Sequence, residues 1–124
     1  MAAPKRRRLS RSGEFDRVYR DGSSNATRYL VLYSFPRKGE DDDSEVRLGV
    51  SASRKLGGAV QRNRAKRVLR EAFWSLSDRL PEGYDFVIVA RPELGDLIER
   101  DGAAGVGSSL EEALAGSVPG GRST

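Results

Sequence analysis

The chain has 124 residues, of which 37% are hydrophobic and 32% charged, and its formal net charge is +4. This length and composition are those of one globular domain with a hydrophobic core. Because the chain contains neither Cys nor His, its composition excludes disulfides, thiolate nucleophiles and thiolate-bound metals, and also excludes a Ser-His-Asp hydrolase or a His-dependent ribonuclease.

Positive charge is concentrated in the N-terminal part of the chain. Residues 1–70 carry 18 Lys and Arg against 8 Asp and Glu, whereas residues 71–124 carry 4 against 10. Residues 46–70 contain eight basic residues and no acidic one. Nucleic acid is therefore the first partner that we expect. The longest unbroken apolar runs have five residues, so we expect neither a membrane span nor a signal peptide, and a cytoplasmic location.

The N-terminal half is predicted to contain a flexible arm, a short helix and two strands. Residues 1–11 carry five basic residues and no acidic one, which is typical of a flexible arm. Apolar residues at 15, 18 and 19 predict a short helix from Ser12 that ends before Gly22. Alternating residues predict strands over 29–35, with one aromatic face, and over 46–52. We expect these two strands to pair as an antiparallel hairpin.

The C-terminal half is predicted to contain a long helix over about 60–80 and a buried central strand over 84–90. A further helix near 94–98 is expected to be interrupted by the glycine-rich segment 102–107, and a capping box at Ser108 predicts a last short helix. Residues 117–124 are expected to form a flexible tail, which leaves 12–116 as a single α+β domain. The acidic stretch 40–45 is expected to be a solvated loop, because it lacks the spacing of a calcium-binding loop.

The long helix is expected to have one basic and one apolar face. At about 100° per residue, one arc carries Arg62, Asn63, Lys66, Arg67 and Arg70. The opposite arc carries Ala65, Val68, Leu69, Ala72 and Leu76. Solvated helix faces usually mix charges of both signs, and this one does not, so we interpret it as a surface for a polyanion.

The segment 61–73, QRNRAKRVLREAF, resembles the signature of the bacterial ribonuclease P protein component, in which an Arg-Asn-Arg triplet is followed by spaced basic residues. Four further features occur in the order found in that family. They are the spacing of Phe15 and Tyr19, the aromatic strand ending near Tyr33, the strand 48–51 that runs into 54–57, and the segment 86–92. The resemblance covers about residues 8–92.

The resemblance implies a small α/β sandwich similar to domain 2 of ribosomal protein S5, with a central, mostly antiparallel sheet, a long basic helix and a left-handed βαβ crossover. It implies an RNA-binding domain that serves as the monomeric protein subunit of a one-protein, one-RNA complex. In that complex a catalytic RNA, which binds most of the Mg²⁺, would remove the 5′ leader of precursor tRNA by hydrolysis. Neither catalytic residues nor metal ligands are expected in the protein.

The resemblance also assigns two sets of binding residues. The set expected to contact the catalytic RNA is Arg62, Asn63, Arg64, Lys66, Arg67 and Arg70. The set expected to bind the precursor tRNA leader is Phe15, Tyr19, Tyr33, Ser51, Arg54, Lys55 and Arg91. Unpaired bases stack on aromatic rings, although the spacing of Phe15 and Tyr19 also fits core packing.

Two other functions fit part of this pattern. A non-catalytic RNA-binding protein of the ribosomal type would need phosphate contacts but no stacking surface for a mobile single strand. A DNA-binding helix is less well supported, because neither a helix-turn-helix spacing nor a dimerisation heptad accompanies the basic helix.

Overall fold

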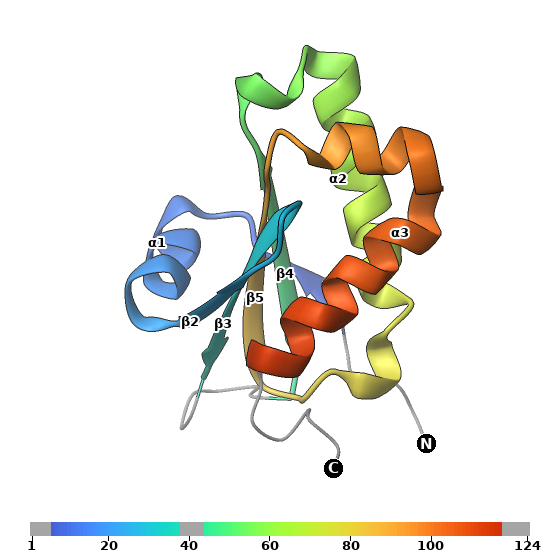
Figure 1. Cartoon of the computed structure of the whole chain (residues 1–124). Helices are drawn as coiled ribbons and strands as arrows, with labels where there is room; N and C mark the ends of the chain where they lie inside the picture. The colour runs from blue at the N-terminus through green and yellow to red at the C-terminus, as the bar shows by residue number, and fades with distance from the viewer. Residues whose placement is uncertain (1–5, 38–43, 118–124) are drawn as a thin grey trace.

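The computed structural model describes residues 6–37 and 44–117 (Figure 1). Five strands form one sheet in the order β1-β4-β5-β3-β2. The strands are β1 (Arg6–Arg8), β2 (Ser23–Ala26), β3 (Leu30–Pro36), β4 (Val46–Ala52) and β5 (Tyr84–Ala90). The helices are α1 (Ser12–Asp21), α2 (Ala59–Trp74) and α3 (Leu94–Ser117), with short 3-10 turns at Arg54–Leu56 and Ser77–Arg79.

The predicted strands over 46–52 and 84–90 are confirmed, but the strand predicted over 29–35 does not form the expected hairpin with 46–52. β5 lies between β3 and β4, antiparallel to β3 and parallel to β4. β2 is antiparallel to β3, and β1 is parallel to β4. The predicted pairing of 29–35 with 46–52 is therefore wrong, and the sheet is mixed. The continuous apolar run of β5 is suited to burial on both faces, which explains its central position.

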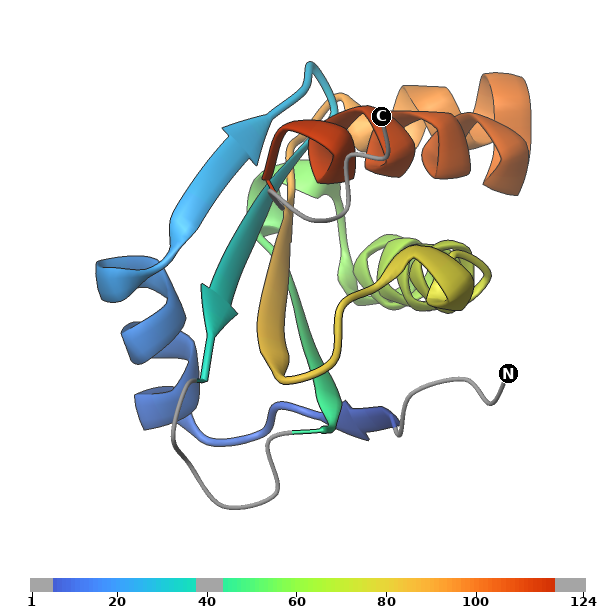
Figure 2. The same cartoon turned by 90° about the horizontal axis from the view of Figure 1, so that it is seen from below.

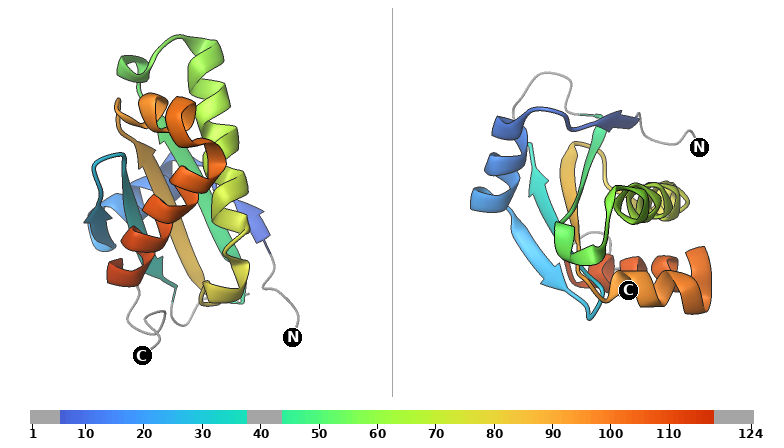
Figure 3. Two further views of the ribbon diagram at one scale, coloured as in Figure 1. Left: turned by 45° about the vertical axis from the view of Figure 1, so that its right-hand side comes forward. Right: turned by 90° about the horizontal axis from the view of Figure 1, so that it is seen from above.

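The connection from β4 through α2 to β5 is left-handed. In the left panel of Figure 3 the helices α2 and α3 lie in front of the sheet, β4 and β5 both run upward, and β5 lies to the left of β4. About 98% of such connections are right-handed. This general preference would have predicted the wrong hand and hydrophobic periodicity does not indicate a hand, so only the family resemblance supplied the correct one.

Helices cover both faces of the sheet, as Figure 2 shows, with α2 and α3 on one side and α1 on the other. The larger core lies under α2 and α3 and includes Leu32, Leu69, Phe73 and Ile88. A smaller core lies under α1 and contains Leu9, Val18 and Val87, with Phe15, Tyr33, Phe35 and Val89 packed against it. The alternation of side chains along β3 and β5 thus fills two separate cores.

The basic N-terminal segment is a strand where it is described. Arg6–Arg8 pair with β4, and the amide of Leu9 donates to the carbonyl of Leu48 at 2.9 Å. Leu9 is only 3% exposed. This one apolar anchor produces no periodicity, so residue patterns predicted an arm. Residues 1–5 and 118–124 lie outside the described residues, and the proposed domain limits at 12 and 116 stay a prediction.

Two further predictions about the elements were wrong, and one was confirmed in part. The predicted interruption occurs as a kink at Gly102 (φ 63°, ψ −153°), but the helical segment that follows already contains Gly105 and Gly107, so Ser108 lies inside α3 and does not begin a last short helix. Val106 and Leu110 are buried, so packing outweighs the low helix propensity of the glycines. α2 ends at Trp74 rather than near Leu80, and the polar strand β2 was not predicted. Among the described helices, none is long and apolar enough to cross a membrane.

Candidate RNA-binding surfaces

Three aromatic side chains that the sequence predicted to act together lie together on the α1 side of the sheet. The ring of Tyr19 meets Tyr33 edge-on at a centroid distance of 4.9 Å, and Phe15 lies 6.4 Å from Tyr19. Phe15 and Tyr33 pack against the smaller core, whereas Tyr19 is 38% exposed. Phe15 and Tyr33 thus take part in core packing, whereas Tyr19 lies at the surface.

Gly49 allows Phe15 to lie directly on the backbone of β4. A Cβ atom at position 49 would be 2.5 Å from Cζ and 2.7 Å from Cε2 of Phe15. Ordinary contacts between carbon atoms are about 3.5–4.0 Å. The glycine is therefore required by the position of the ring, a role that the sequence pattern did not indicate.

The phenol of Tyr19 lies beside Ser51 of β4. Burial raises the pKa of Tyr19, although a hydrogen bond with the Ser51 side chain acts in the opposite direction; the neighbouring Tyr33 and Asp16 raise the pKa further. Tyr19 is therefore neutral at physiological pH. We call Phe15, Tyr19, Tyr33 and Ser51 the aromatic face.

The cations predicted to accompany these residues lie at one end of the sheet. Arg54 and Lys55 belong to the 3-10 turn after β4, and Arg91 follows β5. Since β4 and β5 are parallel, their C-terminal ends meet the same edge, next to Ser51. All three cations are exposed, and Arg91 Nη1 donates to the carbonyl of Thr27 at 3.5 Å. The structure thus gathers the predicted leader-binding residues into one cluster and an adjoining basic edge.

The two faces of α2 are divided as the helical periodicity predicted. Ala65, Leu69 and Ala72 are buried. The predicted basic residues are exposed or half-buried: Arg62, Asn63, Arg64, Lys66, Arg67 and Arg70. We call these six residues the basic face. Among the described residues no carboxylate forms an ion pair with it.

The position of this charge on the helix is unfavourable for stability. The N-cap Gly58 provides no side-chain cap, and the first turn of α2 contains no acidic residue. A cation near a helix N-terminus opposes the helix dipole by about 0.3–1 kcal/mol. Arg62, at the end of the first turn, therefore adds positive potential at a small cost to folding.

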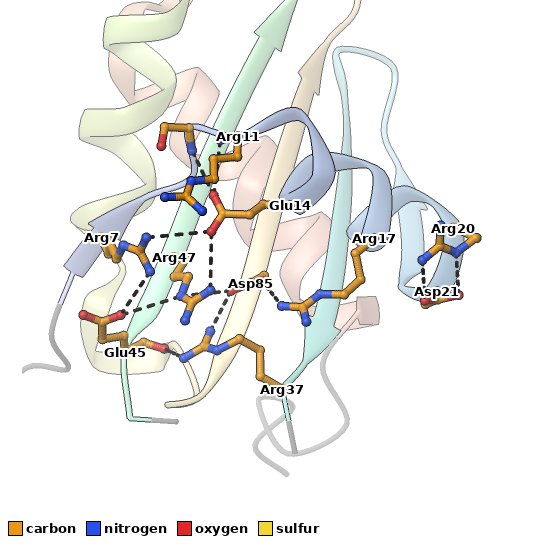
Figure 4. Close-up of polar contacts among 11 residues, drawn as sticks. Arg7, Arg11, Glu14, Arg17, Arg20, Asp21, Arg37, Glu45, Arg47 and Asp85 are labelled. Atoms are coloured by element: carbon orange, nitrogen blue, oxygen red, sulfur yellow. Dashed lines mark hydrogen bonds and ion pairs between the residues drawn. The ribbon is translucent and has the colours of Figure 1, made fainter. Parts of the chain in front are cut away.

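A network of arginines and carboxylates joins α1, β1, β4 and β5 (Figure 4). The fully buried Asp85 accepts hydrogen bonds from Arg37 at 2.6 Å and Arg17 at 3.2 Å. Glu14 lies 3.8 Å from Arg7 and 3.7 Å from Arg47. This network fixes the N-terminal part of α1, and with it the aromatic face, to the sheet.

The carboxylates of this network form ion pairs with arginines. Burial alone would raise the pKa of Glu14, but hydrogen bonds from the amides of Ser10 and Arg11, together with the charges of Arg7 and Arg47, lower it. Among residues 6–37 and 44–117, no group of three or more acidic side chains is arranged to hold a metal ion. Most of the acidic stretch 40–45 lies outside the described residues.

The structure also adds residues that the sequence did not assign to a site. Arg6, Arg8 and Trp74 lie beside Arg70, where β1 approaches α2. The pairing of the N-terminal segment with β4 could not be read from local patterns, so the contribution of these residues to the basic surface was missed.

The family model for Ribonuclease P matches residues 3–113 of the chain. The ribonuclease P protein component of Shouchella clausii is 41% identical over 110 residues, covering 89% of this chain and 84% of the relative. That of Bacillus cereus is 39% identical over 93 residues, covering 75% of this chain and 78% of the relative.

Solved structures agree with these sequence matches. The RNase P protein of Staphylococcus aureus superposes with a TM-score of 0.73 at 34% identity, covering 86% of this chain and 91% of that one. The RNase P protein of Thermotoga maritima gives a TM-score of 0.72 at 31% identity, covering 85% and 92%. The chain therefore belongs to the ribonuclease P protein component family and is the protein subunit of the ribonucleoprotein that processes tRNA 5′ ends.

Proposed function

We propose that the protein holds two RNAs on opposite sides of its sheet. The basic face of α2 binds the RNA subunit, and the aromatic face, with Arg54, Lys55 and Arg91, binds the 5′ leader of precursor tRNA. The observation that carries this proposal is the exposed ring of Tyr19, which lies beside Tyr33 and Ser51 on the face that α2 does not cover.

The chemistry of the two surfaces suits these different roles. Guanidinium groups form planar, bidentate contacts with phosphate, and Asn63 can hydrogen-bond to a base edge or a 2′-hydroxyl. Aromatic rings stack on unpaired bases with little preference for sequence. A mobile single strand with a variable sequence is the ligand that such an aromatic face accommodates.

We assign the chemical step to the RNA subunit and to Mg²⁺ that this RNA binds. The chain has no His or Cys, and the carboxylates Glu14, Glu45 and Asp85 are each in contact with arginine. The protein would contribute binding and positioning. A one-to-one complex with the RNA and a cytoplasmic location belong to this proposal.

The experiment compares precursor and mature tRNA binding to the reconstituted complex, with wild type, Tyr19→Ala and Tyr19→Phe. Loss of one stacked base is worth about 1–3 kcal/mol, which corresponds to roughly a five- to 150-fold weaker binding. Tyr19→Ala should show this loss for precursor tRNA and none for mature tRNA, which has no leader. Tyr19→Phe retains the ring and should bind nearly as wild type.

Tyr29→Ala is the control for a tyrosine with a structural role, because Tyr29 is half-buried and packs against the larger core. It should lower the melting temperature without discriminating between the two tRNAs. If Tyr19→Ala weakens the binding of both tRNAs equally and lowers the melting temperature as Tyr29→Ala does, Tyr19 is a core residue and the leader assignment fails.

A further inference from the structure

The side chains of the three arginines of β1 lie on two different sides of the sheet. Arg7 is in register with Arg47 and lies 3.8 Å from both Glu14 and Glu45 on the α1 side. Successive side chains of a strand point to opposite faces. Arg6 and Arg8 therefore lie on the α2 side, and within the described part of the chain neither forms an ion pair with a carboxylate.

Arg6 and Arg8 meet the end of α2 at a hollow of about 160 Å³, which is also lined by Arg7, Leu48, Arg70 and Trp74. The guanidinium group of Arg7 is paired with Glu14 and Glu45. The guanidinium carbon of Arg6 lies 5.2 Å from the ring centroid of Trp74, a cation–π distance. Burial lowers the pKa of Arg70, and the charge of Arg8 lowers it further. Arg6, Arg8 and Arg70 thus share one surface hollow with no described acidic partner, and the repulsion between Arg8 and Arg70 favours an anion between them.

We propose that this hollow, formed by Arg6, Arg8, Arg70 and Trp74, binds one backbone phosphate of the RNA subunit. Arg70 belongs both to the basic face and to the hollow, so the RNA contact would extend from α2 across to the edge strand β1. The inference rests on the proposed RNA contact of α2. A phosphodiester fits because guanidinium groups form charge-assisted hydrogen bonds with its oxygens, while Trp74 holds Arg6 in position.

The alternation along β1 provides matched variants. Arg6→Gln and Arg8→Gln each remove a charge that has no described carboxylate partner, whereas Arg7→Gln removes a charge that is already paired with Glu14 and Glu45. Arg79→Gln is a second control of equal charge change, because Arg79 is exposed and paired with Glu111 at 2.8 Å. Arg64→Gln tests the basic face itself. The affinity of each variant for the RNA subunit is measured between 50 and 200 mM salt.

A lost phosphate contact lowers the slope of log affinity against log salt by about 0.7–0.9. Over a fourfold rise in salt concentration, the ratio of the wild-type affinity to the affinity of Arg6→Gln or Arg8→Gln should therefore fall by roughly threefold. Arg7→Gln and Arg79→Gln should keep the wild-type slope. Melting temperatures identify any variant that is only partly folded, and Trp74→Leu against Trp74→Phe then tests whether a ring is needed to hold Arg6.

Trp74 is the single tryptophan of the chain, so its fluorescence reports on the hollow directly. Bound RNA should protect Trp74 from quenching by acrylamide in wild type and less so in Arg8→Gln. An unprotected Trp74, or equal slopes for Arg8→Gln and Arg7→Gln, overturns the phosphate site. If Arg64→Gln still lowers the slope in that case, only this inference fails; if it does not, the proposed RNA contact of α2 fails as well.

Discussion

Replacing Gly49 with alanine tests whether the aromatic face depends on the close approach of Phe15 to β4. The new methyl group would lie 2.5 Å from Cζ of Phe15. To restore an ordinary contact of about 3.5–4.0 Å, the ring must retreat by roughly 1 Å or more. Phe15 packs against the smaller core, so this displacement also disturbs Tyr19, whose ring lies 6.4 Å away.

Overpacking of this kind costs about 1–3 kcal/mol. Alanine also reduces the conformational freedom of the unfolded chain, which stabilises the protein by about 0.4–1 kcal/mol. Gly13→Ala separates the two effects, because a Cβ at Gly13 has no atom within 4 Å. The difference in the free energy of unfolding between Gly49→Ala and Gly13→Ala should therefore be about 1–3 kcal/mol, or roughly 4–12 °C in melting temperature.

Denaturant unfolding and precursor tRNA binding are measured for both variants and for Gly49→Ala combined with Phe15→Leu. The smaller leucine relieves the clash, so the double variant should be more stable than the two single losses predict, with a coupling of about 0.5–3 kcal/mol. Its affinity for precursor tRNA should stay low because the ring is gone. Equal stability and equal binding of Gly49→Ala and Gly13→Ala would refute the role assigned to Gly49.

Three further predictions concern the charge network and the chemistry. Asp85→Asn removes the buried negative charge that accepts hydrogen bonds from Arg17 and Arg37 and should lower the free energy of unfolding by about 3–5 kcal/mol; a loss as small as that of the exposed Asp16→Asn would contradict this. Because the folded state lowers the pKa of Glu14 below its ordinary 4.5, its stabilising contribution is present above that pH and is lost as pH falls through the lowered value. The stability difference between wild type and Glu14→Gln should therefore be full at pH 7 and shrink below about 4.5, and a difference that does not change with pH would argue against the network. Protein freed of RNA should not cleave precursor tRNA with added Mg²⁺, and cleavage that survives nuclease treatment would place chemistry in the protein.

Local sequence patterns predicted most elements but not their arrangement. Alternation and apolar runs located β4 and β5, and 3.6-residue periodicity identified the buried face of α2. The pairing of β3 with β5 instead of β4 depends on contacts distant in the sequence, which no local pattern encodes. The polar β2 and the basic β1 are strands because their backbones pair with a neighbour, in spite of side chains that give no strand signal.

The residues of the candidate site could also be predicted only in part. Side-chain type and family spacing identified Tyr19, Tyr33 and Ser51, which the structure brings into contact. The contribution of Gly49 could not be predicted, because it depends on a ring from another element lying against its backbone. The same applies to Arg6 and Arg8, since the local sequence gives no reason for alternate residues of a basic tail to face different sides of a sheet.

The short connection from β4 into α2 determines where the two proposed RNA surfaces meet. Since β4 leads through the turn Arg54–Leu56 directly into α2, the N-terminal half of that helix begins at the edge where β4 and β5 end (Figure 1). Arg62 and Arg64 therefore start from the same edge as Arg54 and Arg91, although the basic and aromatic faces lie on opposite sides of the sheet. An RNA subunit bound along α2 and a leader bound on the aromatic face would approach each other at this edge. There the protein would present cations to two converging phosphate backbones, and would thereby reduce their repulsion and align them without supplying a catalytic group.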